Sequence, residues 1–304
     1  MTVLPVVQSA GSYRRAIQGA MKSVKKKLPV IPFVKMSGAG NDFIIIDHRH
    51  SLFSMDEAAN FARLVCRRRF SVGADGLFLI EDSEVADFKW HFFNADGSLA
   101  EMCGNGARCV ARFAYMQGIA PANMRFETLA GIVEARVADV NVTIRMPQPH
   151  SLRLSTQLAV GDDGTIEIHS LDTGVPHVVC FVEDVNMVDV KAMGRAIRYH
   201  HDFQPAGTNV NFVSLAGGGL KVRTYERGVE DETMACGTGA TASAIVSSLL
   251  DRTDSPVEVI TAGNSRLKIS FEVQGEETIE NVLLKGPAHV IYKGELSPEA
   301  LEEL

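Results

Sequence analysis

The sequence predicts an α+β fold with mostly antiparallel strand pairing, organised as two similar domains with a cleft between them. Three observations support this prediction. Short strand-like runs dominate the chain, convincing helices are few, and a cysteine-containing motif occurs twice, 133 residues apart. Consecutive strands without intervening helices argue against a doubly wound parallel sheet.

Twelve segments have the composition of β-strands. They are rich in valine, isoleucine and phenylalanine, many alternate in polarity, and glycine, asparagine, aspartate or proline bounds them. The expected strands are 42–47, 76–81, 89–94, 132–137, 142–146, 165–170, 177–184, 209–215, 220–226, 257–261, 266–273 and 288–294.

Four helices are expected, at 56–69, 104–117, 187–199 and 237–251. The helix at 104–117 collects small apolar residues on one face, and the helix at 237–251 is small and apolar nearly all round. A helix of the second kind is buried on most sides. We therefore expect these two helices to be central, each wrapped by strands.

The repeated motif defines the two halves. "CGNGA" begins at Cys103 and "CGTGA" at Cys236, and each follows a polar cluster at a strand end, "FNADGS" or "YERG". This repetition predicts an internal duplication, with "MPQPH" at 146–150 as the crossover. The expected N-terminal domain is 31–147 with 285–304, and the C-terminal domain is 148–284.

Composition excludes several classes of partner. A hydrophobic fraction of 46% and a charged fraction of 22% are typical of a soluble globular protein, and the net charge is −7. Nucleic acid is not an expected partner, because phosphate backbones recruit basic faces. A membrane partner is not expected either, since no apolar run approaches the ~20 residues of a spanning helix.

Residues 1–30 differ from the rest, with six basic residues and no acid. The basic residues follow the apolar stretch "VLPVV", which is the wrong order for a secretory signal. We expect a disordered extension, with an organelle transit peptide as the alternative. Five cysteines without a CxxC pair indicate neither a disulfide framework nor a zinc site, so we expect a reducing, cytoplasmic setting and no metal.

A cysteine at the start of a helix has unusual surroundings. The first N–H groups of a helix have no partner within it and carry the positive end of its dipole. They hold anions and lower the pKa of a thiol there from ~8.5 into the range ~3.5–7.5. Glycines leave room for a ligand carboxylate to approach these amides. Cys103 and Cys236 are thus each predicted to be a reactive thiol beside an anion site.

Two such sites that face each other across a cleft suit the inversion of a stereocentre. Both helix ends can hold a carboxylate while one thiolate removes the α-proton and the opposite thiol returns a proton to the other face. Charge then moves onto the carboxylate, where each well-placed N–H donor contributes ~3–4 kcal/mol. Closure of the cleft excludes water and strengthens these interactions.

Other interpretations of the cysteines stay open. A single cysteine is usually a small buried apolar residue, and we interpret Cys66, Cys109 and Cys180 in this way. Cys103 and Cys236 are set apart by their repeated context. They could also form a redox pair, or belong to a non-catalytic module that binds small anions, which leaves the second cysteine unexplained.

From 35–47 to 289–294 the chain resembles the diaminopimelate epimerase family, cofactor-independent enzymes that interconvert LL- and meso-diaminopimelate. The resemblance rests on "GNDF", "FNADGS", "CGNGARC", "PH", "NVNF", "YERG" and "ACGTGA", in family order. It implies two barrel-like domains with the active site between them, diaminopimelate as the small-molecule substrate, no cofactor, a homodimer, and a place in lysine and cell-wall precursor biosynthesis.

The resemblance also implies roles for residues. Cys103 and Cys236 become the acid–base pair, with His177 tuning Cys103 and Glu226 tuning Cys236. Arg227 can hold the substrate's distal carboxylate, the one at the end away from the inverted carbon, through two parallel hydrogen bonds. Further ligand contacts are implied for Asn41, Asn94, Asn209 and Glu226, and for the amides of Gly104, Asn105, Gly237 and Thr238.

One position departs from the family pattern. Many members have Gly-Asn-Pro-His where this chain has Gly174-Val175-Pro176-His177. The missing amide removes a hydrogen-bonding partner, which can cost ~1–3 kcal/mol. The reaction type is untouched, but a racemase of another amino acid on the same fold, such as histidine, stays the nearest alternative.

Overall fold

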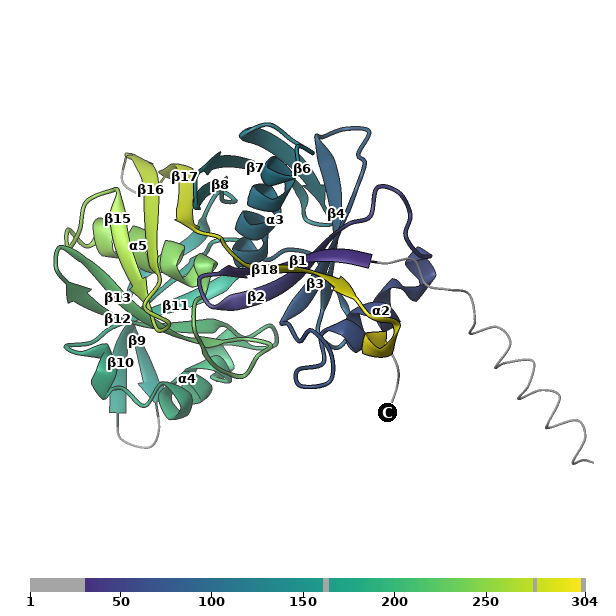
Figure 1. Ribbon diagram of the computed structural model, residues 1–304. Coiled ribbons are helices and arrows are strands. Elements are labelled where there is room, and N and C mark those ends of the chain that lie inside the picture. Colours follow the sequence, from purple (N-terminus) through teal and green to yellow (C-terminus); the bar gives the residue numbers. More distant parts are fainter. Residues whose placement is uncertain (1–30, 161–163, 276–277, 302–304) are drawn as a thin grey trace, which may run out of the picture.

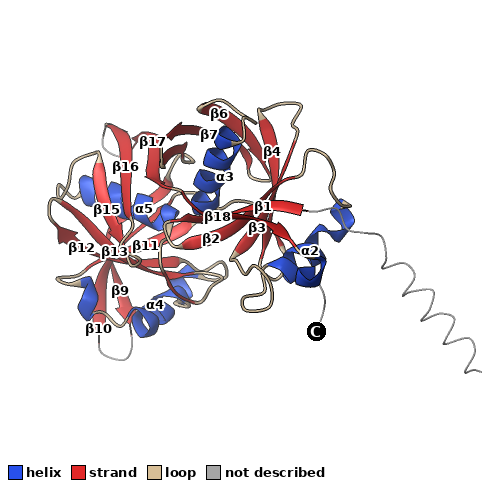
Figure 2. Cartoon of the chain, in the orientation of Figure 1, coloured by secondary structure: helices blue, strands red, loops and turns tan. Residues whose placement is uncertain are grey.

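The computed structural model describes residues 31–160, 164–275 and 278–301, so the expected extension at 1–30 lies outside the described residues. Eighteen strands form one connected sheet in this part of the chain. The sheet surrounds two helices, α3 (Gly104–Met116) and α5 (Gly237–Leu249), as Figures 1 and 2 show. Four pairings are parallel and the others antiparallel. The predicted α+β fold is confirmed.

Strands around α3 come from both ends of the chain. The last strand, β18 (His289–Leu296), pairs antiparallel with the first. The others are β1 (Ile31–Gly38), β2 (Asn41–Asp47), β3 (Gly76–Glu81), β4 (Phe88–Asn94), β5 (Leu99–Ala100), β6 (Asn123–Thr128), β7 (Gly131–Ala138) and β8 (Asn141–Arg145).

Strands around α5 follow one another in sequence. They are β9 (His150–Val160), β10 (Gly164–Asp172), β11 (Pro176–Phe181), β12 (Asn209–Ala216), β13 (Gly219–Glu226), β14 (Asp231–Thr233), β15 (Val257–Thr261), β16 (Arg266–Gln274) and β17 (Thr278–Pro287).

The two halves repeat one pattern of pairings. In the first half β2–β3 and β4–β6 are parallel, and in the second β11–β12 and β13–β15 are parallel. Helix α3 lies between β5 and β6 in the chain, and α5 lies between β14 and β15. The repeated cysteine motif therefore begins the equivalent helix of each half.

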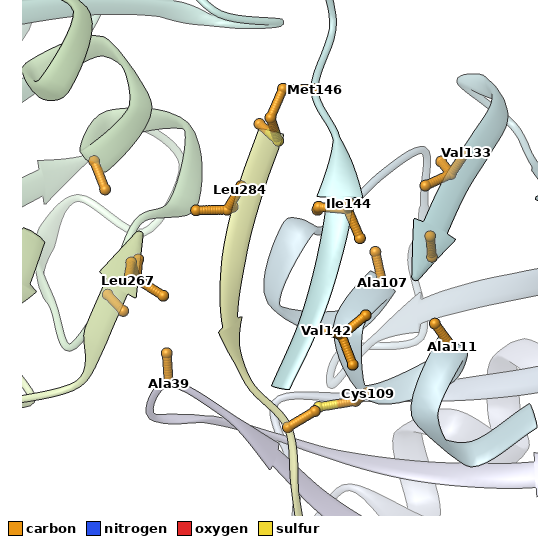
Figure 3. Close-up of a cluster of buried hydrophobic side chains, with 14 of the residues drawn as sticks. Ala39, Ala107, Cys109, Ala111, Val133, Val142, Ile144, Met146, Leu267 and Leu284 are labelled. Carbon is orange, nitrogen blue, oxygen red and sulfur yellow. The ribbon is translucent and has the colours of Figure 1, made fainter. Parts of the chain in front are cut away.

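Strands β8 and β17 join the halves. They pair antiparallel, with Ile144 opposite Leu284, and β17 also pairs with β16. Figure 3 shows Ile144 and Leu284 on these neighbouring strands, with Ala107 of α3 on one side and Leu267 of β16 on the other. One hydrophobic cluster thus runs through both halves. The domain limits of 147/148 and 284/285 stay a prediction.

The two central helices are buried differently. Helix α3 buries the predicted face, and also Arg108, which is fully inaccessible. Helix α5 is buried nearly all round because its residues are small. No helix in the described part of the chain is long and apolar enough to cross a membrane.

Two peripheral helices are shorter than expected. A 3-10 turn at Met55–Glu57 leads into α2 (Ala58–Val65). The helix ends four residues before the expected limit at Arg69, whose φ of 73° is not helical. Helix α4 (Val190–Arg198) begins after Asp189, whose carboxylate accepts from the Ala192 N–H at 3.0 Å.

Six strands were not expected from the sequence. β1 contains Pro32 and is nearly continuously buried, so it shows no alternation. β9 is mostly exposed and polar, and β14 is very short. The other three are β5, β6 and β17.

Candidate active site

Cys103 and Cys236 are the N-cap residues of α3 and α5. Each has an extended backbone, with φ/ψ of −147°/114° for Cys103 and −115°/112° for Cys236. The N–H of Gly106 donates to the Cys103 sulfur at 3.4 Å, and that of Gly239 donates to the Cys236 sulfur at the same distance. Each sulfur thus takes the place of the oxygen of an ordinary capping side chain.

Both cysteines line one cavity of about 450 Å³ between the halves. Both are free thiols, and their charges are close enough for an ionised Cys103 to raise the Cys236 pKa. Ten of the twelve predicted site residues line this cavity: Asn41, Cys103, Gly104, Asn105, Asn209, Glu226, Arg227, Cys236, Gly237 and Thr238.

The glycines of the two motifs are required for different reasons. A Cβ on Gly106 would lie 2.3 Å from the Phe78 ring, and one on Gly239 would lie 2.2 Å from Asn211 Oδ1. These two glycines are needed for packing. A Cβ on Gly104 would meet only ordinary contacts, the nearest at 3.8 Å. Packing does not explain why Gly104 is a glycine, whereas access of a ligand to the helix end does.

The expectation of low thiol pKa values is wrong. Burial raises the pKa of Cys103 to about 11, and the Gly106 N–H opposes it only in part. Burial and then the Glu226 carboxylate raise the pKa of Cys236 to about 12. The loss of water around the sulfurs outweighs the helix N-termini. Both residues are therefore neutral thiols near pH 7.

Glu226 is the carboxylate whose charge acts on both thiols. It ends β13 and accepts a hydrogen bond from the Thr233 hydroxyl at 2.8 Å. Burial raises its pKa above the ordinary value, against the effect of Thr233. A carboxylate with a raised pKa is a stronger base than an exposed one.

His177 does not line the cavity that holds the cysteines. It is buried on β11, and burial together with the Arg227 charge lowers its pKa to about 3. Asn211 Nδ2 donates to the Val178 carbonyl at 2.8 Å and lies 3.1 Å from His177 Nδ1. The carbonyl fixes this amide, so Nδ1 is the acceptor and the imidazole proton is on Nε2.

The His177 Nε2 atom is buried without a hydrogen-bond partner in the described part of the chain. Its neighbour Asn211 packs against Gly239, near Cys236, and among the described residues no hydrogen bond joins His177 to Cys103. Sequence reasoning did not identify Asn211. The expected tuning of Cys103 by His177 stays a prediction.

Asn94 also lies outside the cavity. It is exposed at the end of β4, and its amide donates to the Ser98 hydroxyl at 3.0 Å. Asn209, in contrast, lines the cavity and contacts its neighbours in the cavity wall. Its Oδ1 accepts from the Arg227 backbone N–H at 2.9 Å, and its Nδ2 donates to the Pro176 carbonyl at 3.0 Å. The Arg227 side chain donates to the Ala206 carbonyl at 3.1 Å and keeps further donors for a ligand.

Two more residues behind the cavity wall were not identified from the sequence. Arg108 donates to the Asn105 amide, and Asp75 accepts from the Asn41 amide. For Arg108 a signal was present, because a charged residue three positions before Ala111 lies next to the apolar face of the helix. Asp75 lies in a loop, and nothing in the sequence pointed to it.

One group of potential metal ligands occurs among the described residues, His200, His201 and Asp202. It lies on a short 3-10 turn, and none of the three lines the cavity with the cysteines.

Comparison with known proteins gives consistent matches. The family model described as diaminopimelate epimerase matches residues 33–151 and 169–291. The chain is 47% identical to "Diaminopimelate epimerase" of Aquifex aeolicus, over 89% of this chain and 99% of that protein. It is 46% identical to the protein of the same name from Hydrogenobaculum sp., over 87% and 98%.

A solved structure shares the fold at low sequence identity. It is a phenazine biosynthesis protein of the PhzF family from Bacillus anthracis, with a TM-score of 0.67 and 15% identity. The match covers 88% of this chain and 99% of that chain.

Proposed function

The chain belongs to the diaminopimelate epimerase family, and we propose that it interconverts LL- and meso-diaminopimelate by proton transfer between Cys103, substrate and Cys236. The family places it among isomerases of diaminopimelate and lysine biosynthesis that act on a small molecule. The observation that carries the two-thiol assignment is the pair of N-cap cysteines in one cavity.

The substrate's α-carboxylate binds at the two helix ends. Gly104 and Asn105 begin α3, Gly237 and Thr238 begin α5, and all four line the cavity. The first N–H groups of each helix have no partner within it, so they can donate to the carboxylate. When the α-proton leaves, its electron pair moves onto the carboxylate oxygens and these hydrogen bonds strengthen.

Proton transfer needs one thiolate and one thiol. Because both cysteines are thiols before the reaction, one must first lose its proton to a base. Glu226 is suited to this step, since its charge acts on both thiols and its pKa is raised. The thiolate then takes the α-proton and becomes a thiol, and the opposite thiol protonates the other face and becomes a thiolate.

The high thiol pKa values act on this chemistry in two opposite ways. A thiolate whose conjugate acid has a pKa of about 11 or 12 is a stronger base than an ordinary cysteine thiolate. The α-proton of an amino acid is weakly acidic, so base strength directly lowers the barrier. Burial of the sulfurs thus gives strong bases at the cost of a small thiolate population.

The distal end of the substrate binds at the wall formed by Asn209, Glu226 and Arg227. The Arg227 guanidinium pairs with the distal carboxylate. Val175 also lines the cavity and supplies no polar side-chain group there, which is the feature that favours another amino acid, such as histidine, as substrate.

Purified protein assayed with LL-diaminopimelate tests the proposal. We expect meso-diaminopimelate to form, and kcat/KM to exceed that for L-histidine and other monocarboxylic amino acids by at least about a hundredfold. Turnover of a monocarboxylic amino acid with the larger kcat/KM would assign the substrate to the alternative.

The redox alternative uses the same thiols differently. We expect epimerisation to require reduced cysteines, and the oxidised protein to be inactive. A dithiol oxidoreductase would instead turn over disulfide substrates and show no epimerisation in reductant. The homodimer stays a proposal, which sedimentation analysis tests. The cytoplasmic setting also stays a proposal.

A further inference from the structure

Arg108 is a buried cation whose hydrogen-bond acceptors, among the residues that the structure describes, include no carboxylate. It is fully inaccessible, on the first turns of α3. Its Nη2 donates to Asn105 Oδ1 at 2.7 Å, its Nη1 to the Gly104 carbonyl at 3.2 Å, and its Nε to the Pro287 carbonyl at 3.5 Å. Burial of a guanidinium is costly, and neutral acceptors recover less of that cost than an ion pair does.

The hydrogen bonds continue from Arg108 through Asn105 and Asn41 to Asp75. Asn105 Nδ2 donates to Asn41 Oδ1 at 2.7 Å, and Asn41 Nδ2 donates to Asp75 Oδ2 at 3.0 Å. Asn105 Nδ2 also donates to the Ala235 carbonyl at 3.2 Å, one residue before Cys236. Both asparagines line the cavity, whereas Arg108 and Asp75 do not.

The two end groups of this series of hydrogen bonds, Arg108 and Asp75, determine which atom donates and which accepts at every step. A guanidinium can only donate and a carboxylate can only accept. Asn105 must therefore turn its oxygen toward Arg108, and Asn41 must turn its nitrogen toward Asp75. If either amide flipped, two donors or two acceptors would face each other. A buried donor or acceptor left unpaired costs ~1–3 kcal/mol.

We propose that Arg108 and Asp75 are positioning residues that fix the orientation of the Asn41 and Asn105 amides at the substrate. The identity of the substrate rests on the proposed function, but the hydrogen-bond chain does not. Asn41 is left with one N–H and one oxygen lone pair for a ligand. The hydrogen bond from Asn105 to the Ala235 carbonyl also holds the start of α3 against the residue that precedes Cys236.

The Arg108 charge has a second effect on the site. It lowers the pKa of Cys103 and so opposes the effect of burial. A neutral replacement therefore makes the Cys103 thiol harder to ionise, while lysine keeps the charge. This separates the charge from the hydrogen bonds.

The test compares Arg108→Met, Arg108→Lys and Asp75→Asn with a matched control, Asp42→Asn. Asp42 belongs to the same ion cluster, pairs with Lys35 at 2.7 Å and with Arg68, and Arg68 bridges it to Asp75. Its carboxylate makes no contact with either asparagine in the described part of the chain. The control removes the same charge without interrupting the hydrogen-bond chain.

We expect R108M to raise KM and to lower kcat/KM about tenfold or more. A tenfold decrease corresponds to ~1.4 kcal/mol of lost transition-state stabilisation, which is the size expected for one hydrogen bond. Its thiol-dependent limb of the pH profile should move to higher pH, and R108K should reverse that movement. D75N should lower kcat/KM about threefold or more, and D42N should stay within about twofold of wild type.

Side-chain amide signals in 15N NMR give a readout that needs no substrate. R108M should shift the Asn41 carboxamide signal, although Arg108 does not touch Asn41, and D75N should shift that of Asn105. D42N should leave the Asn105 signal in place. Unchanged Asn41 and Asn105 signals in R108M and D75N would overturn the proposal, even if wild type fails to epimerise diaminopimelate. If R108M does not fold, D75N decides from the other end.

Discussion

Cys103 and Cys236 occupy equivalent positions, each capping its helix with a sulfur 3.4 Å from the N–H three residues later. The equivalence extends to the strands around them, because α3 and α5 have the same place in the two halves. A duplicated half-site thus supplies one thiol from each side of a shared cavity. This arrangement supports the proposed two-base inversion, which needs one thiol on each side of the substrate.

Replacement of either cysteine should abolish epimerisation. We expect Cys103→Ser and Cys236→Ser each to lower kcat about a thousandfold or more, because loss of a positioned acid or base costs ~10²–10⁴. Cys109→Ala is the matched control, since Cys109 is buried on the same helix but does not line the cavity. It should lose some stability and keep kcat within about threefold. Similar losses of kcat in all three variants would show that the cysteines act only through packing.

Alanine at the motif glycines should separate packing from ligand access. Gly239→Ala should destabilise the fold, because its Cβ would lie 2.2 Å from Asn211 Oδ1 and 3.3 Å from the Cys236 sulfur. Gly104→Ala should keep the melting temperature, since its Cβ would meet only ordinary contacts with Ile144 and Leu284, and it should raise KM if the carboxylate binds at this helix end. Thermal melts and steady-state kinetics check both. An unchanged KM for G104A would remove the carboxylate from this helix end.

His177 should make the protein sensitive to acid. Its pKa is about 3 in the folded protein, against 6.5 for an ordinary histidine. Between these values the unfolded chain binds a proton that the folded protein does not, so stability is lost as pH falls. Urea unfolding at pH 7 and pH 5 should show about 2 kcal/mol of loss from this group. His177→Gln should remove that part, and the exposed His201→Gln should not.

Glu226 should have the opposite dependence. Its raised pKa means that the folded protein holds a proton that the unfolded chain has released. Stability from this group is therefore greatest below the unfolded pKa and is lost as pH rises through the folded value. Glu226→Gln should be more stable than wild type at pH 7, and the difference should vanish near pH 4. Its kcat should fall about a hundredfold, as expected for loss of a proton acceptor. Destabilisation by E226Q at pH 7 would contradict the buried-carboxylate account.

Much of the fold followed from local sequence. The starts of α3 and α5 were predicted at the observed residues because capping and a switch of periodicity occur at the same place. β1 and β9 were missed because burial on both faces or exposure of most residues removes the alternation that marks a strand. Helix α2 was overextended because Arg69 gives no sign of its positive φ.

The site was predictable where motifs carry it and unpredictable where tertiary contacts decide. Both cysteines and most ligand contacts line the cavity, yet the direction of the thiol pKa was wrong, since burial cannot be read from a helix start. Asn94 and His177 lie outside the cavity that the cysteines line. The hydrogen bonds from Arg108 to Asp75 join residues from three segments that are far apart in sequence, so no local pattern reveals them.

Solvent isotope incorporation tests the two-thiol mechanism most directly. LL-diaminopimelate is epimerised in D₂O, and the early reaction is followed by 1H NMR and mass spectrometry. We predict one deuterium at the inverted α-carbon of the product and none in the remaining substrate, because separate thiols remove and deliver the proton. Product that retains the original hydrogen, or substrate that gains deuterium as fast as product forms, would show that one base serves both faces.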